Sequence, residues 1–305
     1  MEIISKLKSR WKTCYSYIHS FGMTDRWIVF IEQPLLVKGL KLLTAHLNRK
    51  TMRDCSEWCP EEKNVFYIID KSTGKVLPIE YESEKSFFVF HHINAYEEDN
   101  HLVVDVIGQD KPEILDNMFL DMLRNSDCKH GNKGSVWRFV LPLAENIKDL
   151  PENQNLVGLK YSSATATRKD DTVIVNYEIF TEPAYELPTV NRAFNGKPYK
   201  YFYAGGLHDE SVYKNCIIKV NLETKEVTTW KDSEYCFSGP TEFISRPGAV
   251  QEDDGVLLTA VTDIRHDRRG YLVILDAATM TEIARAQVTE HVPCAVHGLF
   301  LPNLE

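Results

Sequence analysis

Short runs of aromatic and β-branched residues, separated by polar turns, dominate the chain. One pattern recurs: an apolar strand, a short polar turn and a second strand. It appears at residues 65–77, 216–227 and 271–283. Taking Asp70, Asn221 and Asp276 as equivalent points, the units lie 151 and 55 residues apart, which fits a repeat of roughly fifty residues. Hairpins at that period predict an all-β chain built from four-stranded propeller blades.

One segment favours a helix. Residues 110–124 carry Pro112 in what would be the first turn, and four apolar side chains follow at helical spacing. These are Leu115, Met118, Phe119 and Met122. We expect this helix to be an excursion between blades.

Residues 35–47 are almost entirely apolar and contain only two lysines, Lys38 and Lys41. Two interpretations stay open. The segment is either a helix or loop packed into the core, or an exposed apolar patch with lysines at its rim that touches a membrane surface. An enzyme with a lipid-soluble substrate would need the second arrangement.

Composition narrows the class of protein. The 305 residues carry a formal net charge of −9, which argues against binding to nucleic acid, because that affinity comes mainly from Lys and Arg. No long uncharged apolar stretch or signal-peptide core is present, so we expect an intracellular, cytoplasmic protein. The seven cysteines are scattered and form no C-x-x-C pair, and we therefore expect reduced thiols.

Three histidines share one local setting, at or near the end of an apolar run. His91 follows the aromatic strand 87–90 and precedes His92, which must face the other way in an extended strand. His19 lies among aromatic residues, and His297 precedes a glycine. A lone histidine here is more often a core residue than a ligand, but the inner ends of propeller blades converge on one axis. Three imidazoles there could bind iron, copper, nickel or zinc.

Two acidic segments are weak evidence for a functional site when each is considered alone. Glu186 lies among apolar neighbours before Pro188, where a carboxylate is usually a solvated edge residue. Residues 252–254 are three consecutive carboxylates, which lack the alternating ligand spacing of a calcium loop and favour a solvated turn.

Several motifs together resemble the carotenoid cleavage oxygenases, and within them the animal carotene oxygenase and retinoid isomerase branch. They lie at residues 19–24, 28–35, 90–98, 252–255 and 297–300. The resemblance implies a seven-bladed β-propeller with a ferrous ion, Fe(2+), held on its axis by four histidines, three of which contact glutamates. Nothing in this chain matches the first histidine of the family. The resemblance therefore implies a single propeller domain over residues 1–305 that is incomplete at its N-terminus.

The same resemblance assigns residues to the site. The iron ligands would be His19, His91 and His297, while His92 would be structural. Carboxylates that orient the ligands would be Glu186 and, after a two-residue deletion, Glu242. Tyr17 is the expected substrate-binding residue, because its π-face could stabilise positive charge on a polyene.

The implied reaction is cleavage of one carbon-carbon double bond of a carotenoid, with both atoms of O2 ending as carbonyl oxygens in two apocarotenoid or retinal-type products. A retinoid isomerase acting on a retinyl ester is the alternative activity. An inactive scaffold or fragment of the same fold is an alternative of a different class. The implied partners are the carotenoid or retinoid, O2 and a membrane touched peripherally.

Overall fold

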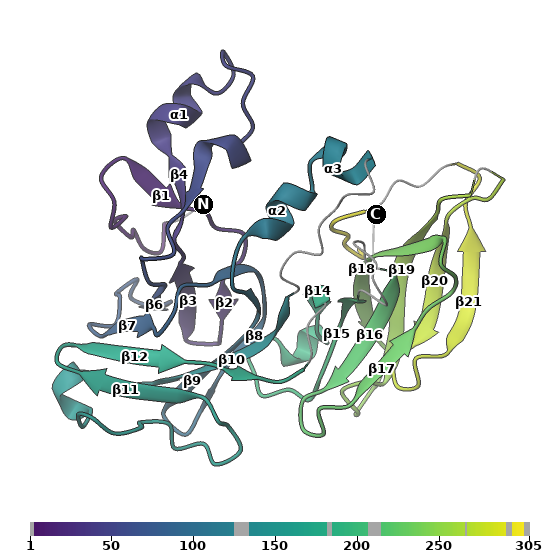
Figure 1. Cartoon of the computed structure of the whole chain (residues 1–305). Helices are drawn as coiled ribbons and strands as arrows, with labels where there is room; N and C mark the ends of the chain where they lie inside the picture. Colours follow the sequence, from purple (N-terminus) through teal and green to yellow (C-terminus); the bar gives the residue numbers. More distant parts are fainter. Residues whose placement is uncertain are drawn as a thin grey trace. The chain divides into compact units, whose positions relative to one another are not determined.

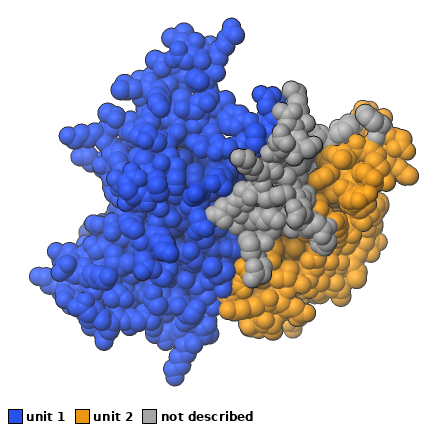
Figure 2. Space-filling model, in the orientation of Figure 1, with its two compact units in different colours: residues 1–179 blue, residues 180–305 orange. Residues whose placement is uncertain are grey.

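The computed structural model is built mainly of β-strands (Figure 1). It describes residues 3–124, 134–181, 185–206, 215–265, 267–290 and 295–301. The chain divides into two compact units, Met1–Ile179 and Phe180–Glu305, which Figure 2 shows in blue and orange. Each unit is described by itself. The prediction of one domain over the whole chain stays a prediction.

The first unit contains three sheets. The largest has the order β11-β12-β7-β6-β3-β2, and β12 and β7 run parallel in it. Its strands are β2 (Gly22–Met23), β3 (Trp27–Glu32), β6 (Val65–Asp70), β7 (Glu80–Ser83), β11 (Thr165–Lys169) and β12 (Thr172–Asn176). The second sheet, ordered β13-β10-β9-β8, consists of β8 (Phe88–Glu98), β9 (His101–Gln109), β10 (Ser135–Pro142) and β13 (Glu178–Ile179). The third, ordered β1-β4-β5, consists of β1 (Cys14–Ser16), β4 (Leu35–Lys38) and β5 (Ser56–Trp58).

The main core of the first unit combines side chains from the six-stranded and four-stranded sheets. Phe66, Phe87 and Phe139 are each no more than 1% exposed, and their rings lie 5.0 to 6.2 Å apart. Burying such a ring contributes about 1.5–3 kcal/mol. Side chains alternate from Phe87 into the start of β8, so that Phe87 and Val89 enter this core, while Phe88 and Phe90 join a second cluster with Leu35.

The second unit contains two antiparallel four-stranded sheets, the kind of sheet predicted for a propeller blade. One is β14 (Tyr185–Thr189), β15 (Tyr201–Gly206), β16 (Cys216–Asn221) and β17 (Val227–Trp230). The other is β18 (Cys236–Ser245), β19 (Gly255–Asp263), β20 (Tyr271–Asp276) and β21 (Glu282–Gln287). Their shared core includes Tyr203 and Phe243, which stack at 5.6 Å.

The recurring hairpin found in the sequence has the same turn each time. A side-chain oxygen at its first turn position accepts two backbone N–H groups, at Asp70, Asn221 and Asp276. Four residues on, the backbone enters the left-handed region, at Gly74 (φ 68°), Lys225 (φ 62°) and Met280 (φ 59°). The strands before all three turns are confirmed, and so is the second strand of the last two units. After the first turn, only an isolated bridge joins Val76 to Ile69.

The helices are short. They are α1 (Gly39–Thr44), α2 (Glu113–Asn117), α3 (Leu120–Arg124) and the 3₁₀ turns η1 (Arg53–Cys55), η2 (Ile147–Asp149) and η3 (Arg192–Phe194). The single helix predicted over residues 110–124 is wrong, because the chain leaves helical geometry between Asn117 and Leu120. No helix within the described residues is long and apolar enough to cross a membrane.

Local structure decides between several expectations. Of the two interpretations left open for residues 35–47, α1 fits the exposed one, because Leu40 is 72% and Leu43 81% exposed, whereas Leu35 in β4 is buried. The apolar run around His19 forms a strand only as far as Ser16. The acidic segment at 252–254 contains the expected turn but is not fully solvated, because Glu252 accepts the N–H groups of Lys200 and Tyr201 at 2.9 and 2.8 Å.

The cysteines are free thiols where the structure describes them. These are Cys14, Cys55, Cys59, Cys216 and Cys236. Cys128 and Cys294 lie outside the described residues. The expectation of reduced cysteines is therefore confirmed for five of the seven.

Candidate metal centre

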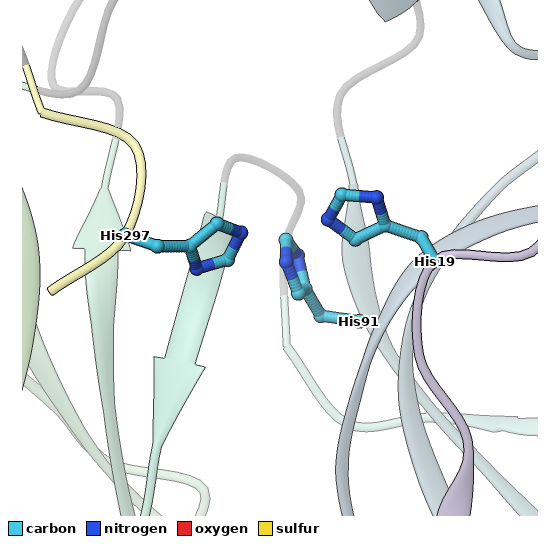
Figure 3. A group of neighbouring side chains, drawn as sticks. All are labelled: His19, His91 and His297. Atoms are coloured by element: carbon cyan, nitrogen blue, oxygen red, sulfur yellow. The ribbon is translucent and has the colours of Figure 1, made fainter. Parts of the chain in front are cut away.

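Two of the predicted ligands meet in the first unit. His19 lies in the loop between β1 and β2, and His91 lies on β8, where the pairing with β9 shifts register on both sides of His92. Their ring centroids are 4.9 Å apart and the rings are perpendicular (Figure 3). A ring nitrogen of one lies within 4.8 Å of a ring nitrogen of the other. Two imidazoles that bind one ion at roughly 2.1 Å hold their nitrogens about 3 to 4 Å apart, so the pair is compatible with a shared metal.

Tyr17 accompanies this pair. Its hydroxyl lies 3.1 Å from Nδ1 of His19, and the two rings stack at 6.2 Å with an angle of 18°. Its ring also lies 6.2 Å from those of Phe88 and Phe90. Burial raises the pKa of the Tyr17 phenol, so the hydroxyl stays protonated. The structure thus brings Tyr17, His19 and His91 together.

His92 faces away from this group, as the alternation of an extended strand predicts. Its backbone N–H and its Nδ1 both lie 2.9 Å from the hydroxyl of Ser20. Burial, and to a lesser extent the neighbouring His91, lowers the pKa of His92 to about 3, so its imidazole is neutral. Sequence reasoning missed Ser20, and its only sequence signal is its place directly after His19.

The remaining predicted residues belong to the second unit. His297, also drawn in Figure 3, is exposed and lies outside any strand, although the sequence places it in an apolar run. Glu186 on β14 is 8% exposed rather than solvated, and its carboxylate accepts the N–H of Leu187 at 2.9 Å. Glu242 on β18 forms an ion pair with Arg192 at 3.0 Å. Their assignment to the site stays a prediction.

This β-rich structure, in which two imidazoles face one another, has the features of proteins that bind a metal through histidine. The comparison with family models is specific. Residues 4–302 match the model of the retinal pigment epithelial membrane protein family, which is the carotenoid oxygenase family, and the chain belongs to that family. The resemblance seen in the sequence is confirmed.

Curated relatives cover the whole chain. It is 36% identical to beta,beta-carotene 15,15'-dioxygenase of Rattus norvegicus over 99% of its length, and 34% identical to the Homo sapiens protein of that name over 100%. It is 35% identical to the mitochondrial carotenoid-cleaving dioxygenase of Macaca fascicularis over 94%. The chain spans about half the length of these relatives, 53%, 55% and 53% respectively.

Solved structures agree on the fold. A variant of Synechocystis apocarotenoid oxygenase superposes with a TM-score of 0.74 at 26% identity, over 93% of this chain and 53% of that one. The cobalt-substituted form of that oxygenase also gives 0.74, at 25% identity and the same coverage. The neighbours have a propeller fold, so the prediction of an all-β propeller is confirmed.

Proposed function

We propose that this chain carries most of the metal site of a non-haem Fe(II) dioxygenase that cleaves one carbon-carbon double bond of a carotenoid. The observation that carries the proposal is the perpendicular arrangement of the His19 and His91 rings. The Tyr17 hydroxyl lies within hydrogen-bonding distance of Nδ1 of His19. Relatives over the full length of the chain are named for this cleavage. No observation favours the retinoid isomerase, which is therefore not proposed.

The residues present fit a ferrous ion. Two imidazoles whose ring nitrogens lie within 4.8 Å of one another suit Fe(II). With Tyr17 at Nδ1 of His19, we assign metal binding to Nε2 of that ring. His297 is the proposed third ligand, on the strength of its motif, and Glu186 and Glu242 are the proposed orienting carboxylates. A propeller of seven blades is part of the same proposal.

The iron, when bound, supplies the redox chemistry toward O2 that no side chain can provide. The chain's own residues hold and shield the reacting groups. Phe90 lies 5.0 Å from the His19 ring and, with Phe88, makes an apolar wall that excludes water from a polyene. The face of Tyr17 extends that wall and can stabilise positive charge on the polyene. Both oxygen atoms of O2 end in the two carbonyl products, so no general acid or base is required.

The exposed face of α1, together with Leu47 in the turn that follows it, is the proposed membrane contact. Leu40, Leu43 and Leu47 are 72%, 81% and 83% exposed. An open groove of about 450 Å³ next to them is lined by Thr13, Tyr15, Gly39, Leu40, Leu42 and Leu43. Lys41, on the same helix, suits the headgroup level of a bilayer. A carotenoid resides in lipid, so this face would let the protein collect its substrate there.

Metal analysis and product analysis test the proposal together. The purified chain, reconstituted with Fe(II) without oxygen, is expected to hold about one iron, and His91→Ala is expected to lose it. His46→Ala is the matched control, because His46 is exposed and lies in the same unit outside the pair. Carotene in detergent micelles is then exposed to O2 and the products separated by chromatography. Bound iron that survives His91→Ala contradicts the proposed site, and bound iron without aldehyde products contradicts the proposed reaction for this chain.

A further inference from the structure

Ser20 is not one of the predicted metal ligands, yet its hydroxyl joins the two segments that carry His19 and His91. We propose that Ser20 is a positioning residue, whose hydroxyl holds His19 and His91 at the spacing that a shared metal requires. The inference rests on the proposed function, since it concerns the geometry of the same site.

The contacts of Ser20 surround His91 on both sides. Its hydroxyl donates to the carbonyl oxygen of Phe90 at 2.7 Å and accepts the N–H of His92 at 2.9 Å. These are the residues directly before and after His91. Because Ser20 itself directly follows His19, one hydroxyl connects the backbone next to one ligand with the backbone on both sides of the other.

The ring of His92 completes the connection. The single hydroxyl proton of Ser20 goes to Phe90, so Nδ1 of His92 carries the proton in its 2.9 Å contact with Ser20. The ring lies close to the backbone of Gly22. A Cβ at Gly22 would lie 3.3 Å from Cδ2 of His92 and 3.2 Å from the Ala95 side chain.

The β-ladder does not hold this part of β8 by itself. Its pairing with β9 shifts register between Val89 and His92, and again between His92 and Asn94. His91 therefore lies in an irregular stretch, where the orientation of a side chain depends on contacts other than regular sheet hydrogen bonds. Ser20 supplies three of them, from a residue 70 positions or more away along the chain.

A merely structural serine can be told apart from a positioning one by a control in the same unit. Ser16 is four residues earlier and bonds in the same manner. Its hydroxyl donates to the carbonyl of Gln33 at 2.8 Å and accepts the N–H of Gln33 at 3.0 Å. Those bonds join β1 to Gln33, directly after β3, and a further contact of 3.1 Å reaches the carbonyl oxygen of Tyr17; none of them involves a predicted metal ligand. Ser16→Ala and Ser20→Ala should therefore destabilise the fold to a similar degree, while only one should disturb the metal.

The experiment titrates Co(II) into the purified chain and follows its visible absorption, which reports ligand geometry as well as affinity. We expect Ser20→Ala to weaken Co(II) binding 10–100-fold and to change the spectrum. Ser20→Thr, which keeps the hydroxyl, should restore most of the affinity. Ser16→Ala should remain within about twofold of the wild type, in keeping with a contact that does not orient a ligand.

Each outcome decides something. Wild-type chain that binds Co(II) while Ser20→Ala binds it equally well, with the same spectrum, overturns this inference and leaves the proposed function standing. Equal losses in Ser16→Ala and Ser20→Ala also overturn it, because the effect would then be general destabilisation. Wild-type chain that binds no Co(II) overturns the proposed site and this inference together.

Discussion

Arg138 on β10 and Asp105 on β9 lie directly opposite one another and are joined by two hydrogen bonds of 2.7 Å each. Both side chains are buried, at 5% and 0% exposed. The pair lies in the four-stranded sheet that also carries His91 on β8. In such a setting each charge depends on the other, because neither reaches water.

Replacing Arg138 with Met should destabilise the first unit by about 3–5 kcal/mol, since Asp105 would keep a buried charge without its guanidinium. The measurement is the free energy of unfolding in urea, followed by circular dichroism. The control is Arg246→Met, which breaks the exposed ion pair with Asp254 and should cost about 0–1 kcal/mol. If both variants lost the same free energy of unfolding, burial could not be the reason that the Arg138–Asp105 pair matters more than the exposed pair.

The repeated hairpin predicts a stabilising substitution. Lys225 holds a left-handed backbone (φ 62°) at the position that Gly74 occupies in the first hairpin. Lys225→Gly should therefore raise stability by up to about 1 kcal/mol, since glycine takes this conformation without strain. Thermal unfolding measures the change, and a lower melting temperature would refute the prediction.

Gly74 itself should tolerate no side chain. A Cβ there would lie 2.0 Å from the carbonyl oxygen of Ile4, in addition to the strain of φ 68°. Gly248 has a similar φ of 78°, but nothing lies within 4 Å of its Cβ position. Gly74→Ala should lower the melting temperature clearly more than Gly248→Ala. Both variants carry the backbone strain of a positive φ, so the difference between them measures the clash with Ile4. Matching losses would show that the contact with Ile4 is not maintained in solution.

The carboxylate of Asp70 should make the free energy of unfolding depend on pH in the acidic range. The Ser72 hydroxyl, the Thr73 backbone N–H and Arg26 hold the pKa of this carboxyl well below its usual range. Because the native pKa is depressed, the contribution is complete above the unfolded pKa of about 4 and is lost as pH falls through the native value. The stability difference between wild type and Asp70→Asn should therefore shrink between pH 7 and pH 3, as measured by urea midpoints. A difference that stays constant over this range would rule out the carboxylate as its source.

Local sequence could predict much of this fold because its signals act within a few residues. The turn at Asp70 depends on residues 70–75, so its pattern could be found twice more along the chain. The site was reached through a resemblance, because His19 and His91 are 72 positions apart and nothing local relates them. Ser20 was missed for the same reason.

Other errors came from tertiary contacts that override local pattern. The apolar face of residues 110–124 suits one helix, yet the chain forms two short ones separated at Met118 and Phe119. The sequence favours a solvated edge carboxylate at Glu186, but this side chain, next to a register shift in β14, is only 8% exposed. For residues 35–47 the sequence left burial and exposure open, and the structure shows that α1 has no buried residue.

At the site, Tyr17→Phe separates the two roles given to Tyr17. The variant keeps the ring that packs on Phe88 and Phe90 but removes the hydroxyl from Nδ1 of His19. We expect metal affinity to fall about 10-fold, because the His19 ring loses an orienting hydrogen bond, while the melting temperature changes little. Calorimetric titration with Co(II) measures the affinity. Unchanged affinity would limit Tyr17 to the wall of the substrate site.

The final prediction concerns binding of the exposed face of α1 to a membrane. Leu43→Glu places a charge on a side chain that is 81% exposed, so folding should not suffer, but insertion into a bilayer interface should. Binding to phosphatidylcholine vesicles, measured by flotation, should fall several-fold. The matched control is Val250→Glu, which makes the same charge change on a side chain that is 89% exposed in the second unit. Equal binding by wild type and both variants would exclude α1 as the membrane contact, whereas a loss confined to Leu43→Glu would mean that its exposed leucines enter lipid.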